Sequence, residues 1–106
     1  MEMVSIKLFK NGTSVLEKAG KRDEQVLTFD NITYNLNDQI LIREDDNFRF
    51  YLDFNKNISE ITIKENNYKL NLKIKVINKS ISNNIHEIYY NIESENVIEN
   101  KIIITF

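Results

Sequence analysis

The chain has no cysteine, proline or tryptophan, and only two glycines and one histidine among its 106 residues. Without cysteine it can form no disulfide, thiolate nucleophile, cysteine zinc site or iron–sulfur cluster. A single histidine cannot form a cluster of histidine ligands, so we expect no metal and no cofactor. The sequence also lacks a glycine-rich phosphate loop and a nucleophile-elbow pattern. We therefore predict no catalytic residues and no enzyme activity, although two carboxylates could still meet in the folded chain.

Length and net charge exclude further classes of protein. A chain of this length corresponds to one domain, residues 1–106. Its 14 basic and 16 acidic residues give a net charge of −2, whereas nucleic-acid binders usually have a basic excess. The N-terminus carries an acid at position 2 rather than a signal sequence, and no apolar run approaches the roughly 18 residues of a membrane span. We expect a cytoplasmic protein that binds neither nucleic acid nor membranes.

Alternation of apolar and polar residues, the period of a β-strand, runs through almost the whole chain. Phe48 and Phe50 share one face of their segment, for example, and Arg49 and Tyr51 share the other. The pattern predicts strands at residues 3–10, 13–18, 25–30, 31–36, 39–44, 48–54, 58–65, 68–79, 85–93 and 97–106. The only segment that suits a short helix lies within residues 14–24, and residues 19–24 have the composition of an exposed loop.

Short turns rich in asparagine and aspartate separate these strands. Asn11-Gly12 is a signal for a two-residue hairpin. Asparagine and aspartate tolerate a left-handed backbone, so they can replace glycine in the other turns. Strands joined by short turns form an antiparallel up-and-down meander, and closure removes its exposed edges. We therefore predict an all-β, up-and-down barrel of about 8–10 strands, with a two-sheet sandwich as the alternative.

Several stretches resemble a known family. They are Ile32–Leu36, Gln39–Glu44 and Phe50–Phe54, and later Tyr68–Val76, Ile88–Ile92 and Ile98–Ile104. In their order, residues 31–106 resemble the YwiB-like bacterial proteins, which are small uncharacterised calycin-like barrels. The landmarks are Arg43 after an apolar strand and a tyrosine, Tyr89 or Tyr90, in the penultimate strand. The resemblance implies a small calycin- or lipocalin-like barrel from a low-GC bacterium, and it implies no catalytic residues.

The polar residues on the apolar faces suggest a ligand site. A barrel of about eight strands is either filled by its own side chains or holds one small ligand. In the binding hypothesis, a small apolar or amphipathic ligand occupies the interior. Its wall includes Phe48, Phe50 and Leu70, and its polar contacts come from Tyr34, Tyr68 and Tyr90. Arg43 would bind an anionic head group if it points inward. A packed core whose tyrosine hydroxyls reach the barrel mouth is the alternative.

A second hypothesis assigns the function to the outer surface. The alternation places Leu41, Ile77, Tyr89 and Ile103 outside, where they would form an apolar patch. With a filled core, such a protein would act by docking on a partner protein or by forming a homodimer. Concentration-dependent dimerisation in gel filtration would favour this alternative.

Three further features have simple structural explanations. His86 shares a face with Ile88 and Tyr90, so we interpret it as a partly covered histidine at a turn rather than a general base. Residues 44–47 concentrate acids in what we interpret as a solvated turn rather than a calcium site. Lysines 69, 73, 75 and 79 lie on one face of their strand, and we expect glutamates of the next strand to pair with them.

Overall fold

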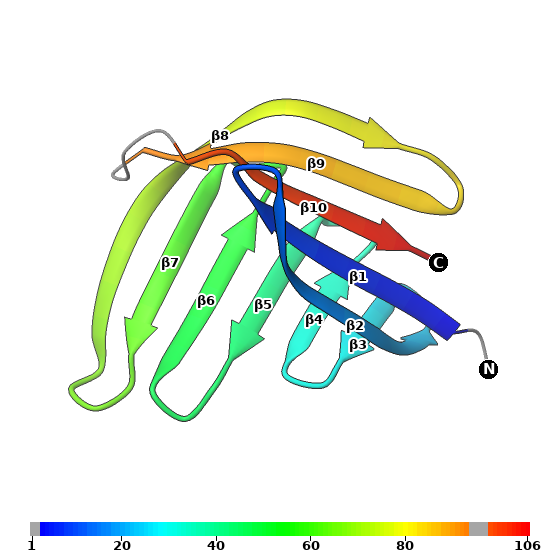
Figure 1. The fold of residues 1–106 in the computed structure, drawn as a ribbon. Coiled ribbons are helices and arrows are strands. Elements are labelled where there is room, and N and C mark those ends of the chain that lie inside the picture. The colour runs from blue at the N-terminus through cyan, green and yellow to red at the C-terminus, as the bar shows by residue number, and fades with distance from the viewer. Residues whose placement is uncertain (1–2, 94–97) are drawn as a thin grey trace.

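The computed structural model describes residues 3–93 and 98–106, which form one closed antiparallel barrel (Figure 1). Each strand pairs with the next along the chain, and β1 pairs with β10 to close the barrel. The strands are β1 (Met3–Lys10), β2 (Thr13–Asp23), β3 (Val26–Phe29), β4 (Ile32–Asn35), β5 (Ile40–Glu44), β6 (Phe48–Asp53), β7 (Ile58–Ile63), β8 (Tyr68–Ile81), β9 (Ile85–Ile92) and β10 (Asn100–Thr105). The predicted all-β meander barrel is confirmed. No helix in the described ranges is long and apolar enough to cross a membrane.

The turns use asparagine and aspartate as the sequence predicts. Asn11, Asp30, Asn57 and Asn67 all have a positive φ, between 49° and 60°. A short polar side chain tolerates this left-handed backbone better than most residues do. The chain therefore makes tight connections although it has only two glycines.

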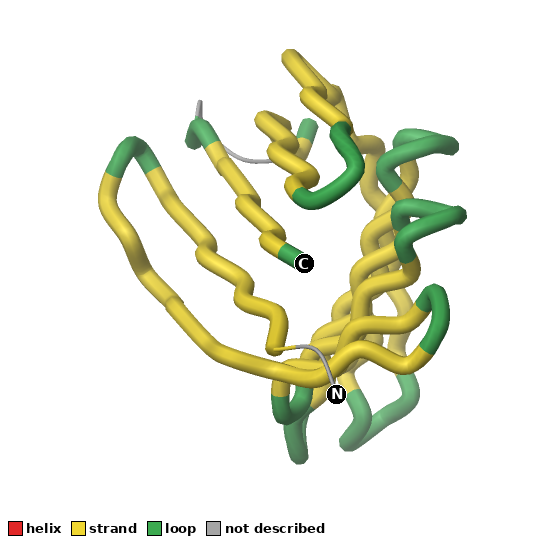
Figure 2. The backbone as a smooth tube through the Cα atoms, turned by 90° about the vertical axis from the view of Figure 1, so that its right-hand side faces the viewer, coloured by secondary structure: helices red, strands yellow, loops and turns green. Residues whose placement is uncertain are grey.

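The predictions of a short helix within residues 14–24 and of a loop at residues 19–24 are wrong, because the strand predicted at residues 13–18 continues as β2 to Asp23. Its first part pairs with β1, and its last three residues pair with β3, so β2 bends from one wall of the barrel to the next (Figure 2). At the bend, a Cβ on Gly20 would lie 2.1 Å from the carbonyl oxygen of Thr28 and 2.6 Å from the Phe29 ring. Glycine is therefore required for β2 to cross this closely over β3.

β8 contains an irregularity that reverses its alternation. The pairing register of β8 with β9 shifts between Val76 and Asn78, which leaves the exposed Ile77 as an extra residue. After this bulge Lys79 lies opposite the buried Ile88 and faces inward. The prediction that Lys79 shares a face with the other lysines is therefore wrong.

The expected pairing of the lysines with β9 is also not observed among the described ion pairs. Lys69 lies 3.9 Å from Glu60, which belongs to β7 rather than β9. Glu87 on β9 accepts a hydrogen bond from the neighbouring Tyr89 instead. The lysines of β8 thus form neither one stripe nor a ladder of ion pairs with the next strand.

Inward-facing side chains pack one end of the barrel tightly. The fully buried ones are Ile6, Leu27, Phe29, Ile32, Tyr34, Phe54, Ile88, Ile102 and Ile104. At the other end, the hairpin between β7 and β8 extends beyond this core. Inner-face residues there, such as Tyr68 and Leu70, are 55% and 42% exposed. The barrel is therefore filled at one end and open at the other.

Candidate ligand-binding cavity

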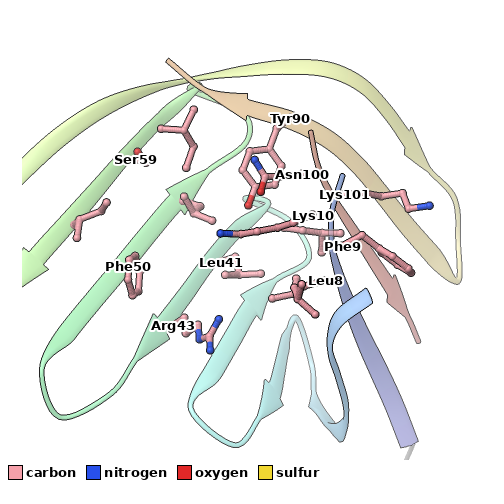
Figure 3. A pocket seen from close by; sticks show the side chains of 15 residues that line it. Leu8, Phe9, Lys10, Leu41, Arg43, Phe50, Ser59, Tyr90, Asn100 and Lys101 are labelled. Carbon is pink, nitrogen blue, oxygen red and sulfur yellow. The ribbon is translucent and has the colours of Figure 1, made fainter. Parts of the chain in front are cut away.

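A cavity of about 220 Å³ lies in the open half of the barrel (Figure 3). Six strands contribute most of its wall. Its lining residues are Leu8, Phe9, Lys10, Val15, Leu41, Arg43, Phe50, Leu52, Ser59, Ile61, Tyr90, Ile92, Asn100, Lys101 and Ile102. Most of them are apolar, with a few polar groups, which is the usual composition of a small-molecule site.

The strand register explains why these residues share one wall. Leu41 lies opposite Leu52, and Leu52 lies opposite Ser59, so the three form a row across β5, β6 and β7. Residues directly opposite each other in an antiparallel sheet project to the same face. Ser59 is the small member of the row, and its hydroxyl donates to the carbonyl oxygen of Leu72, 3.0 Å away. A small side chain between large ones leaves unfilled space beside it.

The second row of this wall brings in the arginine. Arg43 lies opposite Phe50, and Phe50 lies opposite Ile61. Arg43 therefore faces the same side of the sheet as these two apolar residues, and it lines the cavity while remaining exposed to solvent. The sequence leaves this register undecided, since residues 40–42 are apolar on both faces, and the structure resolves it.

The opposite wall carries further polar groups. Asn100 on β10 lies between Tyr90 on β9 and Lys10 on β1, opposite both of them. Tyr90 and Asn100 are buried, and the Asn100 amide donates to the carbonyl oxygen of Ile98 at 3.3 Å. Figure 3 shows Lys10 extending toward Leu41, below Tyr90 and Asn100. The cavity thus combines apolar residues with hydrogen-bonding groups on both walls.

The predicted ligand residues divide into three groups. Arg43, Phe50 and Tyr90 line the cavity together. Phe48, Tyr68 and Leu70 are exposed and do not line it. Alternation indicates the face of a strand on which a side chain lies, but it does not indicate how far the strand extends beyond the core.

The seventh predicted residue, Tyr34, lies in the packed end of the barrel. Its hydroxyl lies 2.7 Å from Nδ1 of His86, and the edge of the His86 ring also packs against Phe106. Burial raises the pKa of Tyr34, so its hydroxyl stays protonated and can donate to the imidazole. Tyr34 is therefore engaged in the core and does not line the cavity.

His86 faces inward with Ile88 and Tyr90, as predicted, but it is covered more completely than expected. It is only 5% exposed. Its pKa is lowered mainly by burial and secondly by the positive charge of Lys79. A neutral histidine bonded to a tyrosine is a satisfied core residue. This arrangement supports the structural interpretation of His86.

One residue of the predicted outer patch, Leu41, faces the interior of the barrel. It is 3% exposed and lines the cavity, because it lies opposite the buried Tyr34 and Leu52. The prediction that Leu41 faces outward is wrong. The other predicted members of the patch, Ile77, Tyr89 and Ile103, lie on β8, β9 and β10.

Several cavity residues were not predicted as ligand contacts, among them Leu8, Lys10, Ser59 and Asn100. Lys10 and Leu8 continue the inward alternation of Val4 and Ile6, so the period of β1 could have identified them. Asn100 interrupts an apolar face, a pattern that is visible in the sequence. Ser59 gives no such signal, because only its position between two large residues of neighbouring strands makes it part of a cavity.

The acidic turn is held by hydrogen bonds and ion pairs. The Asp45 carboxylate accepts from the backbone N–H groups of Asn47 and Phe48, both at 2.8 Å, and these bonds lower its pKa. Glu44 lies 2.6 Å from Lys64 and 3.5 Å from Arg49, and the bond from Lys64 is the main cause of its lowered pKa. Over residues 3–93 and 98–106, no three or more acids and histidines are grouped to hold a metal ion.

Comparisons of the chain with protein-family models, curated proteins and solved structures find no significant match. The resemblance of residues 31–106 to the YwiB-like proteins stays a prediction from the sequence.

Proposed function

We propose that this protein is a non-catalytic binding protein that holds a small apolar or amphipathic ligand inside its barrel. The observation that supports the proposal is the cavity of about 220 Å³ with its largely apolar lining. A fully packed core would leave few voids larger than a water molecule. The unfilled half of this barrel therefore favours the hollow alternative over the filled one.

The cavity volume limits the ligand. One water occupies about 30 Å³ of liquid, and a methylene group is similar in size, so this space holds roughly seven such groups. Lys10, Val15 and Arg43 are exposed while they line the cavity, so it reaches solvent without unfolding of the barrel. A ligand with six to eight carbon atoms therefore fits better than a long-chain lipid.

The interaction hypothesis receives less support. Without Leu41, the predicted outer patch retains Ile77, Tyr89 and Ile103. Lys101 stands 5.4 Å from the centre of the Tyr89 ring, and the Tyr89 hydroxyl donates to Glu87, so charges interrupt the patch. A homodimer stays a prediction, to be measured by gel filtration. From its composition we also propose that the protein is cytoplasmic, is not an enzyme and binds neither nucleic acid nor membranes.

Native mass spectrometry of the protein purified without denaturation tests the proposal. We expect a mass excess that disappears on unfolding. As a control, Ser59→Leu enlarges a side chain in the cavity wall and should remove the excess, with folding checked by circular dichroism. A wild-type protein that carries no added mass, and that is not stabilised against heat by octanoate or 1-octanol, would contradict the proposal. Free ligand a hundredfold above its Kd should stabilise the fold by about 2.7 kcal/mol.

A further inference from the structure

The charged residues of the cavity wall are all cationic. Lys10, Arg43 and Lys101 line it, and no aspartate or glutamate does. This is unexpected for a chain with 16 acidic and 14 basic residues and a net charge of −2. A concave site lined by one sign of charge concentrates ligands of the opposite sign.

Lys10 and Arg43 make no ion pair in the described parts of the chain, although the positive charge of Arg43 helps to lower the pKa of Asp45. Five other cations each lie within 4 Å of a carboxylate, namely Lys7, Lys18, Arg49, Lys64 and Lys69. Both side chains line the cavity, so their charges are available to a bound molecule.

Lys101 has a different role. Its ammonium lies 4.4 Å from the centre of the Phe9 ring and 5.4 Å from that of Tyr89. These cation–π contacts already engage its charge. Figure 3 shows Lys101 extending away from Tyr90 and Leu41, whereas Lys10 extends toward them. The two cations that face the cavity are therefore Lys10 on β1 and Arg43 on β5.

We propose that the ligand is a small organic carboxylate, with Lys10 and Arg43 as the residues that select its negative charge. The inference rests on the proposed function and specifies the ligand class of the same cavity. Charge-assisted hydrogen bonds to a carboxylate are about twice as strong as neutral ones. An amine of the same shape would be repelled by both cations, and an alcohol would lack the charge that they attract.

The test compares octanoate, 1-octanol and octylamine, which share a chain length and differ in head group. Isothermal titration calorimetry on the unmodified protein at neutral pH measures each Kd. We expect octanoate to bind at least about tenfold more tightly than 1-octanol, because hydrogen bonds to a charged group are stronger than those between neutral groups. Octylamine should show no binding.

Single variants then locate the selectivity. Lys10→Gln and Arg43→Gln should each weaken octanoate binding about tenfold and leave 1-octanol binding unchanged. Lys7→Gln is the matched control, because Lys7 lies on the other face of the same strand and its loss changes the net charge equally. All three residues are exposed, and circular dichroism checks that each variant folds.

The outcomes separate this inference from the proposed function. Equal binding of octanoate and 1-octanol would overturn the carboxylate selectivity and leave the binding function intact. If Lys7→Gln weakens octanoate as much as Lys10→Gln, the overall charge of the protein attracts the ligand, and the assignment to the cavity residues is wrong. If none of the three compounds binds, both the selectivity and the proposed function fail for ligands of this size.

Discussion

Gly20→Ala tests the explanation of how the barrel turns from β1 toward β3. The added Cβ would lie 2.1 Å from the Thr28 carbonyl oxygen and 2.6 Å from the Phe29 ring. The ring can move, but the carbonyl oxygen belongs to the backbone of β3 and can move only if the strands separate. Extra atoms in a packed site cost about 1–3 kcal/mol, and contact with backbone places this variant at the upper end. We expect a loss of about 3 kcal/mol, a large fraction of the roughly 5–15 kcal/mol that stabilises a typical domain.

Urea unfolding followed by circular dichroism measures this loss. With an m-value of about 2 kcal/mol per molar, a loss of about 3 kcal/mol lowers the unfolding midpoint by about 1.5 M. Gly12→Ala is the control, because it also adds a methyl group to a glycine but meets no atom within 4 Å. Its positive φ of 81° should cost about 1–2 kcal/mol through backbone strain alone. If Gly20→Ala lowers the midpoint no more than Gly12→Ala does, the close approach of β2 and β3 does not require glycine.

Three further predictions concern the packed end of the barrel. Tyr34→Phe should cost about 1–3 kcal/mol in urea unfolding, because it leaves the buried Nδ1 of His86 without its partner. The folded pKa of His86 lies below its unfolded value of 6.5, so the unfolded chain binds the proton first as the pH falls. The free energy of unfolding should therefore decline below about pH 6.5. His86→Gln should remove this part of the decline. If the variant leaves the pH profile unchanged, the decline does not come from His86. Lys79→Met should raise the pKa of His86 in an NMR titration and cost about 1–2 kcal/mol, because Gln39 and the Phe54 carbonyl lose a donor.

The sequence was sufficient to predict most strands and their order. Alternation depends only on which face of a strand is buried, and the short asparagine turns leave neighbouring strands little choice of partner. The prediction failed at β2, where Ala19, Gly20 and Lys21 show no alternation. The close approach to Thr28 that explains Gly20 is a tertiary contact with another strand.

The candidate site was harder to predict. The face of Leu41 could not be read, because its neighbours Ile40 and Ile42 are also apolar, and only the pairing with Leu52 places it inside. The bulge after Val76 reverses the alternation without a glycine or proline to mark it. The bond between Tyr34 and His86 joins residues 52 positions apart, and no local pattern predicts it.

The β1–β10 pairing has a consequence for how the chain folds. Every other pairing in the barrel joins consecutive strands, whereas this one brings Ser5 opposite Thr105. Closing a loop of about 100 residues costs about 4 kcal/mol of chain entropy, far more than closing a hairpin. The hairpins should therefore form first and this seam last, so an early intermediate exposes β1 and β10 as unpaired edges. Such edges recruit other chains, and we expect refolding yield to fall as protein concentration rises.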